Sequence, residues 1–428
     1  QIYNCVMAMQ SKRIICFLIL FLCIQAIWIA VLLPYSLVKP VPVSKLVNCS
    51  NHDDGVPSSL IRREDIKIGT NPPCYKVVYI WLNEHDTFHV NLIFKQVGRF
   101  CCPGLSCGVQ IEYGRNLAKL AASDVVFLFY KSSWDWHELL NIKHQTERQK
   151  WVFWTSESPR HTDHRVIPLP EYTNTTYDYI MTYRKGATNK DAYLSEGGYG
   201  HFNRKTPSVQ KNDTGNWATD KTRMVAWVST NCYPSTMSYD RTGFVNALSR
   251  YVSVDKYGPC GSQPCKDLGT CGLQKYRFYL ALENSECADY ITEKFWYNSL
   301  TLGLVPIVFG APKEDYLKVA PPNSFIFVPD FPSIAKLAAY LVELSENDNL
   351  YNKYFEWKKE GSVTFHKQFS NLEPQRLCDS VVRRVLKDEE AERDQKGNRE
   401  KKPLVNDWDK WWTKSCTYTV SGFPIPDE

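Results

Sequence analysis

The pattern of apolar and polar positions divides most of the chain into two blocks, each containing short apolar runs. In the first block, strand-length runs lie at residues 76–82, 124–130, 151–154 and 177–183. The last three are apolar or aromatic along almost their whole length, which is typical of strands that are covered on both faces. This block therefore predicts a sheet with both faces buried.

The second block repeats the alternation of strands and helices. Strand-length runs lie at residues 224–229, 252–258, 276–282, 304–310 and 325–328, and apolar residues at helical spacing lie at residues 241–251, 290–302 and 333–346. A polar segment, residues 201–223, separates the blocks and predicts a linker. The alternation predicts two α/β domains that face a cleft, at residues 71–200 and 224–386.

One further segment is too long and too apolar to belong to either block. Residues 14–33 contain only one clearly polar residue, Gln25, and twenty residues in a helix span a hydrocarbon core of ~30 Å. Lys12 and Arg13 precede the segment, and no small-residue cleavage site follows it. These features predict a transmembrane signal anchor with residues 1–13 in the cytoplasm.

Composition adds limits to this picture. The 428 residues are 43% hydrophobic, which is enough for two domains with their own cores. The net charge of +5 and the lack of a basic stripe argue against a nucleic-acid partner. Outside the domains, residues 34–70 are polar and contain prolines, and predict a stem, while residues 387–428 predict a charged loop and tail.

The cysteines and glycosylation sequons indicate an oxidising compartment. Twelve of the fifteen cysteines follow the anchor, and an even number is typical of a disulfide-bonded lumenal domain. Sequons at Asn48, Asn174 and Asn212 fit the same compartment. The two cysteine clusters, at residues 101–107 and 260–271, lack the paired spacing of a zinc site, so the sequence predicts no metal site.

The segment LENSECADYITEKFW, residues 282–296, follows an apolar run and contains four carboxylates and one lysine, Lys294. In open α/β sheets, ligands bind beyond the carboxyl ends of the strands, where the next helix begins. Thr292 can cap that helix, and Lys294 would then lie in its first turn. A helix start with a lysine favours an anion such as a diphosphate.

The carboxylates of this segment need a separate explanation. Glu293 would lie in the first turn of the helix, where the helix dipole alone favours a negative charge. Glu283 would lie at the end of the strand, where it could accept hydrogen bonds from hydroxyl groups. A mixture of acidic groups and one lysine fits a nucleotide sugar better than a bare phosphate.

A longer stretch around this segment resembles a known family. The run FYLALENSECADYITEKFWYNSL, followed by GLVPIVFGAPKEDYLKVAPPNSFIFVPDF, is similar to the donor-site signature of the α1,3-fucosyltransferases, and WVFWTSESPR and MVAWVSTNC resemble two further segments. The similarity covers roughly residues 75–360. It implies a GT-B-like architecture of two Rossmann-like domains, with an N-terminal acceptor domain and a C-terminal GDP-fucose domain.

The resemblance also assigns roles to individual residues. Glu157 matches the base that takes the proton from the acceptor hydroxyl in an inverting transfer. Arg241 and Lys294 match the cations that meet the charge developing on GDP. Glu293 matches the glutamate that contacts fucose. Further matches to donor-site positions are Tyr290 and Asn284.

The expected activity is transfer of L-fucose from GDP-fucose to the 3-OH of a GlcNAc in protein-linked glycans, by a single-pass type II Golgi membrane enzyme with a lumenal catalytic domain. No metal is required in this scheme, although Mn²⁺ or Mg²⁺ can assist. The segments GAPKEDYLKVAPP and NDWDKWW look more like the branch that fucosylates the core GlcNAc of N-glycans. A Lewis-type acceptor, LacNAc or LacdiNAc, stays open.

Two sequence features and two alternative functions qualify these expectations. Gly198-Tyr199-Gly200 stands where the family often has Pro-Tyr-Gly, and the Asp-Trp-Asp at residues 407–409 has the form of a metal motif but lies in the predicted tail. A catalytically silent protein that binds glycans or nucleotide sugars would keep the fold without the activity. A glycoside hydrolase would also present carboxylates, as a pair across the bond, but would not need the phosphate-binding cations.

Overall fold

The structure, a computed structural model, describes most of the chain after residue 73. The described residues are 74–82, 97–128, 148–162, 167–168, 176–189, 193–194, 198–208, 215–265, 271–366, 373–394, 403–417 and 425–427. The predicted anchor and stem, and the sequons at Asn48, Asn174 and Asn212, lie outside these residues. Within the described ranges, no helix is long and apolar enough to cross a membrane.

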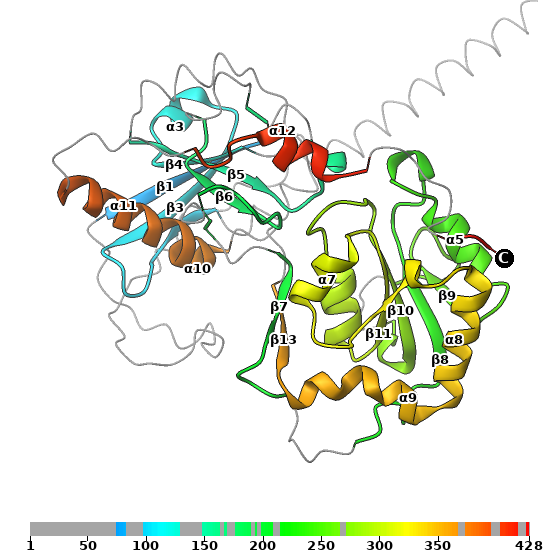
Figure 1. The fold of residues 1–428 in the computed structure, drawn as a ribbon. Helices are drawn as coiled ribbons and strands as arrows, with labels where there is room; N and C mark the ends of the chain where they lie inside the picture. Colours follow the sequence, from blue (N-terminus) through cyan, green and yellow to red (C-terminus); the bar gives the residue numbers. More distant parts are fainter. Residues whose placement is uncertain are drawn as a thin grey trace, which may run out of the picture. The chain divides into compact units, whose positions relative to one another are not determined.

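The first sheet has six strands in the order β2-β3-β1-β4-β5-β6, and all neighbours except the β2–β3 pair are parallel (Figure 1). From β1 the chain adds β3 on one side and β4, β5 and β6 on the other, which is a doubly wound order. The strands are β1 (Cys74–Trp81), β2 (Gly98–Phe100), β3 (Cys107–Gly114), β4 (Val125–Leu128), β5 (Lys150–Thr155) and β6 (Tyr179–Thr182).

The second sheet has five parallel strands in the order β12-β11-β10-β8-β9. They are β8 (Arg223–Val228), β9 (Val254–Tyr257), β10 (Tyr276–Leu282), β11 (Val305–Phe309) and β12 (Ile326–Phe327). Here the order is again doubly wound, and the chain changes direction between β8 and β10. Ligands bind beyond the carboxyl ends of the strands at such a switch point.

Successive side chains of the central strands enter different hydrophobic clusters. Phe278 and Leu280 of β10 belong to a cluster with residues of α5 and α8, whereas Tyr279 and Ala281 belong to a cluster with residues of α7. The helices are α3 (Leu117–Ala121), α5 (Arg241–Leu248), α6 (Glu293–Phe295), a π-helix (Trp296–Thr301), α7 (Lys313–Val319), α8 (Ile334–Glu346) and α9 (Asp348–Asn352). The predicted α/β class with two parallel sheets is thus confirmed.

A two-stranded antiparallel ribbon joins the sheets. β7 (Gly200–Asn203) follows the first sheet, β13 (Ser362–Phe365) follows the second, and the two pair along four residues each. The ribbon packs on the π-helix, and a Cβ atom on Gly200 would lie 2.6 Å from the Trp296 ring. β7 therefore lies inside the segment that the sequence predicted as a linker.

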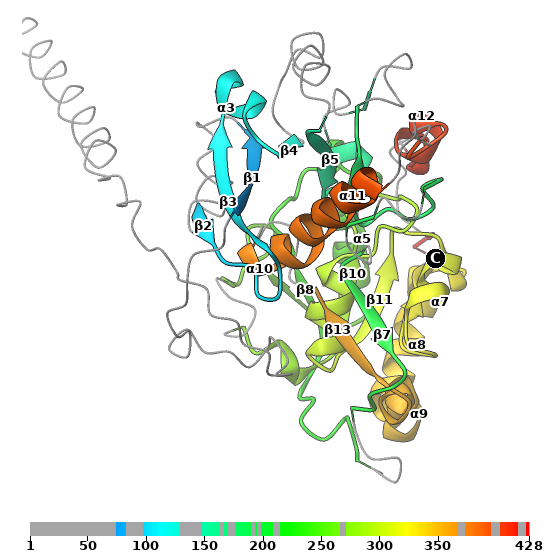
Figure 2. The ribbon, with the colours of Figure 1, turned by 90° about the vertical axis from the view of Figure 1, so that its left-hand side faces the viewer.

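The C-terminal segment returns to the first sheet, which corrects two predicted boundaries. The segment contains α10 (Pro374–Leu377) and α11 (Arg383–Asp394), which Figures 1 and 2 show beside β1 and β3. Tyr179 of β6 donates a hydrogen bond of 2.6 Å to Asp388, and Cys378 forms a disulfide with Cys102. Residues 374–386 thus accompany the first sheet, although they were assigned to the second domain, and residues 387–394 are helix rather than a charged loop.

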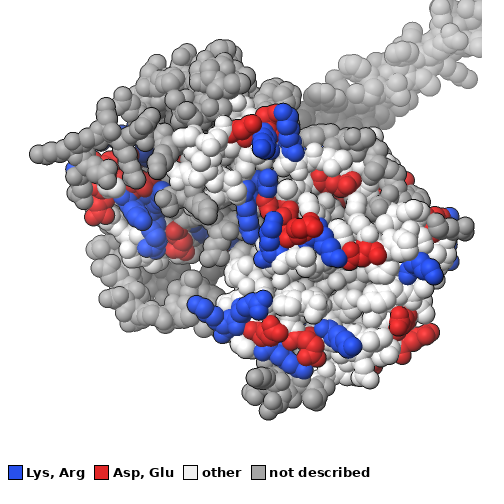
Figure 3. Space-filling view, viewed as in Figure 1, with Lys and Arg blue, Asp and Glu red and all other residues white. Residues whose placement is uncertain are grey.

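Five disulfides connect described cysteines, in agreement with the predicted disulfide-bonded domain. The pairs are Cys74–Cys107, Cys102–Cys378, Cys232–Cys260, Cys265–Cys271 and Cys287–Cys416. Two of them, Cys102–Cys378 and Cys287–Cys416, join segments that are 276 and 129 residues apart in the sequence. On the described face in Figure 3, acidic and basic side chains are interspersed.

Candidate active site

Arg241 occupies the switch point of the second sheet. It is the first residue of α5, follows the capping residue Asp240, and is almost fully buried. Its guanidinium donates to the Leu282 carbonyl at the end of β10 (3.0 Å), and to the Asn231 carbonyl (3.1 Å) and Ser229 hydroxyl (3.4 Å) beyond β8. The side chain therefore ties the carboxyl ends of β8 and β10 together and places a positive charge between them.

Lys294 lies beside this point, at the start of α6. Thr292 caps the helix by accepting a hydrogen bond from the Lys294 backbone N–H, as predicted. The Lys294 ammonium donates to three acceptors: Glu283 (3.1 Å), Thr292 Oγ1 (2.9 Å) and Glu293 (3.1 Å). A phosphate oxygen that binds the ammonium would have to replace one of these acceptors. Glu293 is the more exposed of the two carboxylates, so it is the acceptor that can be replaced most easily.

Glu283 has different partners from those predicted. Its side chain is fully buried, and its two oxygens accept from the Thr292 N–H (2.8 Å), the Thr292 hydroxyl and Lys294. Gly310 packs directly on it, because a Cβ atom there would lie 2.6 Å from the Glu283 Cβ. The geometry therefore makes Glu283 a support for Thr292 and Lys294 instead of an acceptor for sugar hydroxyls.

The electrostatics of this cluster follow from burial and proximity. Burial raises the pKa of Glu283, against the opposing charge of Lys294. Burial also acts to raise the pKa of Glu293, but Lys294 outweighs it and holds the pKa below its usual value. The two carboxylates in turn raise the pKa of Lys294, although burial opposes this. Lys294 is thus held as an ammonium ion and Glu293 as a carboxylate at neutral pH.

Glu157 reaches the same region from the first sheet. It lies two residues beyond β5, and its backbone N–H donates to the Thr155 hydroxyl (3.1 Å). Tyr290, in the loop between β10 and α6, donates its hydroxyl to the Glu157 carboxylate at 3.2 Å. Next to this contact, Ser158 and Ser285 share a buried hydrogen bond of 2.8 Å. The Glu157 carboxylate, beyond the end of β5 in the first sheet, therefore contacts the loop that follows β10 in the second sheet.

Two further buried tyrosines, Tyr183 and Tyr199, lie near the Tyr290 ring that contacts Glu157. The Tyr290 ring lies 4.8 Å from the Tyr183 ring and 6.5 Å from the Tyr199 ring, between centroids. Burial, and then the nearby Glu157 charge, raise the pKa of Tyr290 and of Tyr199 well above the usual value. Both hydroxyls therefore stay protonated and act as donors. Both hydroxyls also lie within electrostatic range of Glu293.

Two family models match this chain. The fucosyltransferase N-terminal model covers residues 74–193, and the glycosyltransferase family 10 (fucosyltransferase) C-terminal model covers residues 218–398. The chain belongs to the fucosyltransferases of glycosyltransferase family 10. The boundary between the models falls beside β7, where the chain leaves the first sheet.

Curated fucosyltransferases from other organisms share sequence with this family member. Mouse alpha-(1,3)-fucosyltransferase 4 is 36% identical over 219 residues, 50% of this chain and 47% of that protein. Rat alpha-(1,3)-fucosyltransferase 7 is 31% identical over 264 residues, 60% of this chain and 65% of that protein. Glycoprotein 3-alpha-L-fucosyltransferase A of Drosophila melanogaster is 37% identical over 266 residues, 61% of this chain and 48% of that protein.

The chain thus spans between 47% and 65% of the length of these relatives. Among solved structures, an α1,3-fucosyltransferase with GDP-fucose matches with a TM-score of 0.45 and 17% identity, over 80% of this chain and 95% of that chain.

The structure brings together most of the residues that the family resemblance selected. Glu157 contacts Tyr290, Glu293 contacts Lys294, and Tyr290 lies within electrostatic range of Glu293. Asn284 lies at the edge of this group, where its side-chain oxygen accepts a hydrogen bond of 3.0 Å from Ser285. Arg241 is buried beneath the group, with acceptors already provided by the protein.

Sequence reasoning missed the other members of the fucosyltransferase site. Tyr183 and Arg184 follow the short strand β6, and Tyr199 was noticed only as part of Gly198-Tyr199-Gly200. Arg184 forms an ion pair with Asp289, one of the four carboxylates of the acidic segment. A signal was present in each case, because all three polar side chains lie just beyond strands of the first block or beside the linker.

The structure explains the Asp-Trp-Asp motif without a ligand. Asp407 caps α12 (Trp408–Trp411) by accepting a hydrogen bond of 2.9 Å from the Lys410 N–H, and Asp409 pairs with Lys414 at 2.7 Å. In the part of the chain that the structure describes, no group of three or more His, Cys, Asp or Glu residues is arranged to hold a metal ion.

Proposed function

We propose that this protein transfers L-fucose from GDP-fucose to the 3-OH of a GlcNAc residue in protein-linked glycans, with inversion at the anomeric carbon. The observation that carries the proposal is the hydrogen bond from Tyr290 to Glu157, because it joins the acidic group of the first sheet to the loop that follows β10. An inverting transfer needs one carboxylate beside the acceptor and cations beside the leaving phosphate. Glu157, Lys294 and Arg241 supply these groups.

In the proposed reaction, the acceptor oxygen attacks the anomeric carbon as the bond to the GDP phosphate breaks. The hydroxyl proton passes to Glu157, and GDP leaves with the electron pair of the broken bond. Lys294, released from Glu293 by a phosphate oxygen, stabilises the charge on GDP. Glu293 is then free to face the positive charge that develops on the sugar. The cations come from the protein, so we propose that no metal is required and that Mn²⁺ or Mg²⁺ assists at most.

We propose the core GlcNAc of N-glycans as the preferred acceptor and LacNAc or LacdiNAc as the next candidates. Support comes from the NDWDKWW segment and from the similarity to a Drosophila glycoprotein 3-alpha-L-fucosyltransferase. We also propose a Golgi location, with residues 14–33 as a single-pass type II anchor and the catalytic part in the lumen. The long-range disulfides support this location, because such bonds persist in oxidising compartments.

A glycan panel tests the proposal directly. The full chain in detergent is offered GDP-fucose with chitobiose-core, LacNAc and LacdiNAc acceptors, and products are identified by mass spectrometry and linkage analysis, with and without EDTA. We expect one added fucose in α1,3 linkage on at least one acceptor. Binding of GDP-fucose without transfer would favour a silent binding protein, and release of free fucose without an acceptor would favour a hydrolase.

The variant Glu157→Gln tests the assigned base. We expect transfer to fall by about a hundredfold or more, which is the order of a general base's contribution, while the GDP dissociation constant measured by calorimetry stays unchanged. Thr162→Ser, a conservative change in the same loop, serves as the control. Near-normal turnover in Glu157→Gln would remove Glu157 from the mechanism.

A further inference from the structure

The loop between β10 and α6, residues 283–291, is called here the donor loop. It carries Asn284 and Tyr290, and its two ends are held by Glu283 and Thr292 as described above. Between these ends lies Cys287, which is buried and bonded to Cys416. The question is what this disulfide does for a loop that must present Tyr290 to a carboxylate of the other sheet.

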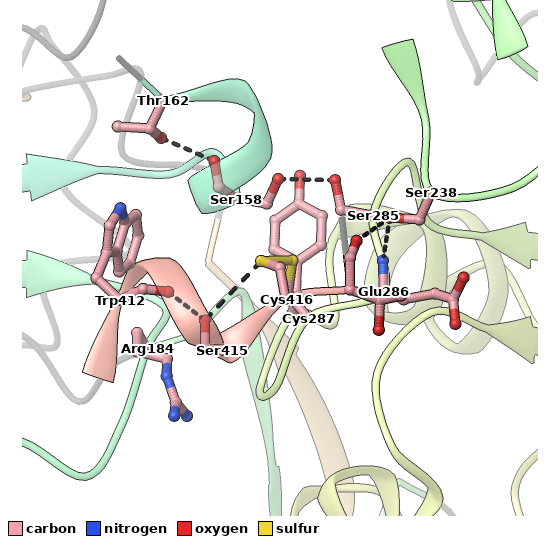
Figure 4. Close-up of a disulfide and its surroundings, with 12 residues drawn as sticks. Ser158, Thr162, Arg184, Ser238, Ser285, Glu286, Cys287, Trp412, Ser415 and Cys416 are labelled. Carbon is pink, nitrogen blue, oxygen red and sulfur yellow. Dashed lines mark hydrogen bonds between the residues drawn. A yellow bond between two sulfur atoms is a disulfide. The ribbon is translucent and has the colours of Figure 1, made fainter. Parts of the chain in front are cut away.

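The partner segment, residues 408–417, is called here the strap. Around the disulfide it pairs with the donor loop as a short antiparallel bridge (Figure 4). The Ala288 N–H donates to the Ser415 carbonyl, and the Thr417 N–H donates to the Glu286 carbonyl, both at 2.9 Å. One covalent bond and two flanking backbone hydrogen bonds therefore fix the middle of the donor loop to the strap.

The other end of the strap is anchored on the first sheet. The rings of Trp408, Trp411 and Trp412 lie 5.1, 5.9 and 5.0 Å from the ring of Phe153 in β5. All three tryptophans are buried, and the Trp411 indole donates to the Lys185 carbonyl at 2.8 Å. Since each large aromatic side chain buries about 150–250 Å², the strap cannot leave the sheet without exposing a large apolar surface.

This arrangement connects the two halves of the active site by a path outside the reacting groups. The Phe153 anchor lies on β5, four residues before Glu157, and Cys287 lies three residues before Tyr290. The Tyr183 ring lies 5.8 Å from Trp412 and 4.8 Å from Tyr290, so it packs between the strap and the donor loop. The strap thus determines how far the donor loop can move from the base.

We propose that Cys287 and Cys416 are positioning residues for fucosyl transfer: their disulfide ties the donor loop to the strap on β5 and so holds Tyr290 against Glu157. The proposal rests on the function proposed above. It places the disulfide outside the chemistry, since neither sulfur touches the reacting groups, and it predicts an effect on the transfer step in particular.

The full chain with both cysteines replaced, Cys287→Ser with Cys416→Ser, is compared with Cys102→Ser plus Cys378→Ser. Both pairs close long loops, so their removal costs similar stability in the chain-entropy account of disulfides. The Cys102–Cys378 bond lies before β3, at the amino end of the strands, away from Glu157. Assays are made well below the melting temperature of both variants.

We expect kcat to fall by about tenfold or more in the Cys287/Cys416 variant, because a misplacement of ~1 Å costs on the order of a hundredfold. The dissociation constant for GDP should change little, since Lys294 and Arg241 lie outside the strap. Hydrogen exchange should become faster in residues 284–291. The control variant should lose stability but keep kcat and the exchange rates of this loop.

A kcat equal to that of the control variant would overturn the proposal. If the Cys287/Cys416 variant does not fold, the folded unmodified protein is reduced stepwise and alkylated, and loss of activity is compared with modification of each cysteine. Activity that persists after Cys416 is alkylated overturns the proposal equally. Failure of the unmodified protein to transfer fucose to any acceptor contradicts the proposed function instead, and the exchange rates and alkylation still show whether the strap holds the loop.

Discussion

At the scale of single residues, acceptors of the protein and of the ligand compete for one ammonium group, that of Lys294. Lys294 is surrounded by Glu283, Thr292 and Glu293. Glu283 is buried and cannot move away, whereas Glu293 is partly exposed. In the proposed reaction, a diphosphate therefore gains Lys294 at the expense of Glu293. Binding of the leaving group and release of the second acidic group become one event.

The variant Lys294→Ala tests this competition. We expect the GDP dissociation constant to rise by about tenfold or more, because a hydrogen bond to a charged group contributes about 1.5–3 kcal/mol. Calorimetry measures it, and Lys353→Ala, which removes an exposed lysine of the same sheet domain, is the control. An unchanged affinity for GDP would show that Lys294 does not contact the phosphates.

At the scale of secondary-structure elements, the C-terminal helix α11 changes the picture that the sequence suggested. Val381, Val382 and Val385 are buried, and the residues after them are charged. The charged part still faces the first sheet, because Lys76 lies 2.5 Å from Glu389 and Lys150 lies 2.9 Å from Glu392. In this fold, the run of mixed charge is therefore part of a helix that packs against the first sheet.

A chain that ends at residue 386 tests the role of this segment. It lacks eight of the twelve residues of α11 and the whole strap, so the three tryptophans no longer cover Phe153. We expect rapid proteolysis of the first sheet and no transfer, measured by limited proteolysis and the glycan assay. Glu392→Gln, which removes only the exposed partner of one ion pair, should leave both unchanged. Full resistance of the shortened chain to protease would show that the segment is a dispensable tail.

The same scale shows what the sequence could and could not predict. All nine predicted strands are present with ends within two residues, because parallel strands buried on both faces have continuous apolar runs. β3 was missed because polar residues, Gln110 and Glu112, alternate with its apolar ones. β7 and β13 were missed because each is short and forms only against a strand about 160 residues away.

For the site, the family resemblance selected Glu157, and the junction of strand and helix selected Lys294, but neither predicted the surroundings of these residues. The Tyr290–Glu157 contact joins residues 133 positions apart, and the disulfide joins Cys287 to a cysteine 129 residues later. Such pairings depend on how the two sheets are connected, which no local pattern records. The same limit explains why Glu283 was expected at a sugar and lies instead beneath Thr292.

At the scale of the whole molecule, two partly buried lysines of the second domain contribute a pH dependence to the stability. Burial lowers the pKa of Lys358 to about 8, and burial together with the nearby charge of Lys358 lowers the pKa of Lys221 to about 8. Between about pH 8 and the ordinary value of 10.5, each of these lysines binds more protons in the unfolded chain than in the folded one. Their contribution to stability therefore rises with pH across this window, whereas buried tyrosines with raised pKa values, such as Tyr290 and Tyr199, contribute in the opposite sense as the pH approaches 10.

Urea unfolding at several pH values between 8 and 10.5 measures this slope. We expect the slope of the free energy of unfolding against pH to be lower in Lys358→Met than in the unmodified protein, by up to about 1.4 kcal/mol per pH unit, because the variant lacks the positive contribution of this lysine. Lys336→Met, at an exposed position of α8, is the matched control and should keep the slope. Identical slopes in all three proteins would show that these lysines are solvated in the folded state.

The antiparallel ribbon of β7 and β13 has a consequence for how substrates enter. The chain crosses from one sheet to the other and back along this ribbon, and the Cys287–Cys416 disulfide fastens the sheets a second time. Because the two sheets are connected at two separate places, the distance by which one sheet can open away from the other is restricted. Binding of the donor and release of the product should therefore depend on small local changes, such as the exchange of partners at Lys294. We accordingly expect turnover to be insensitive to solvent viscosity.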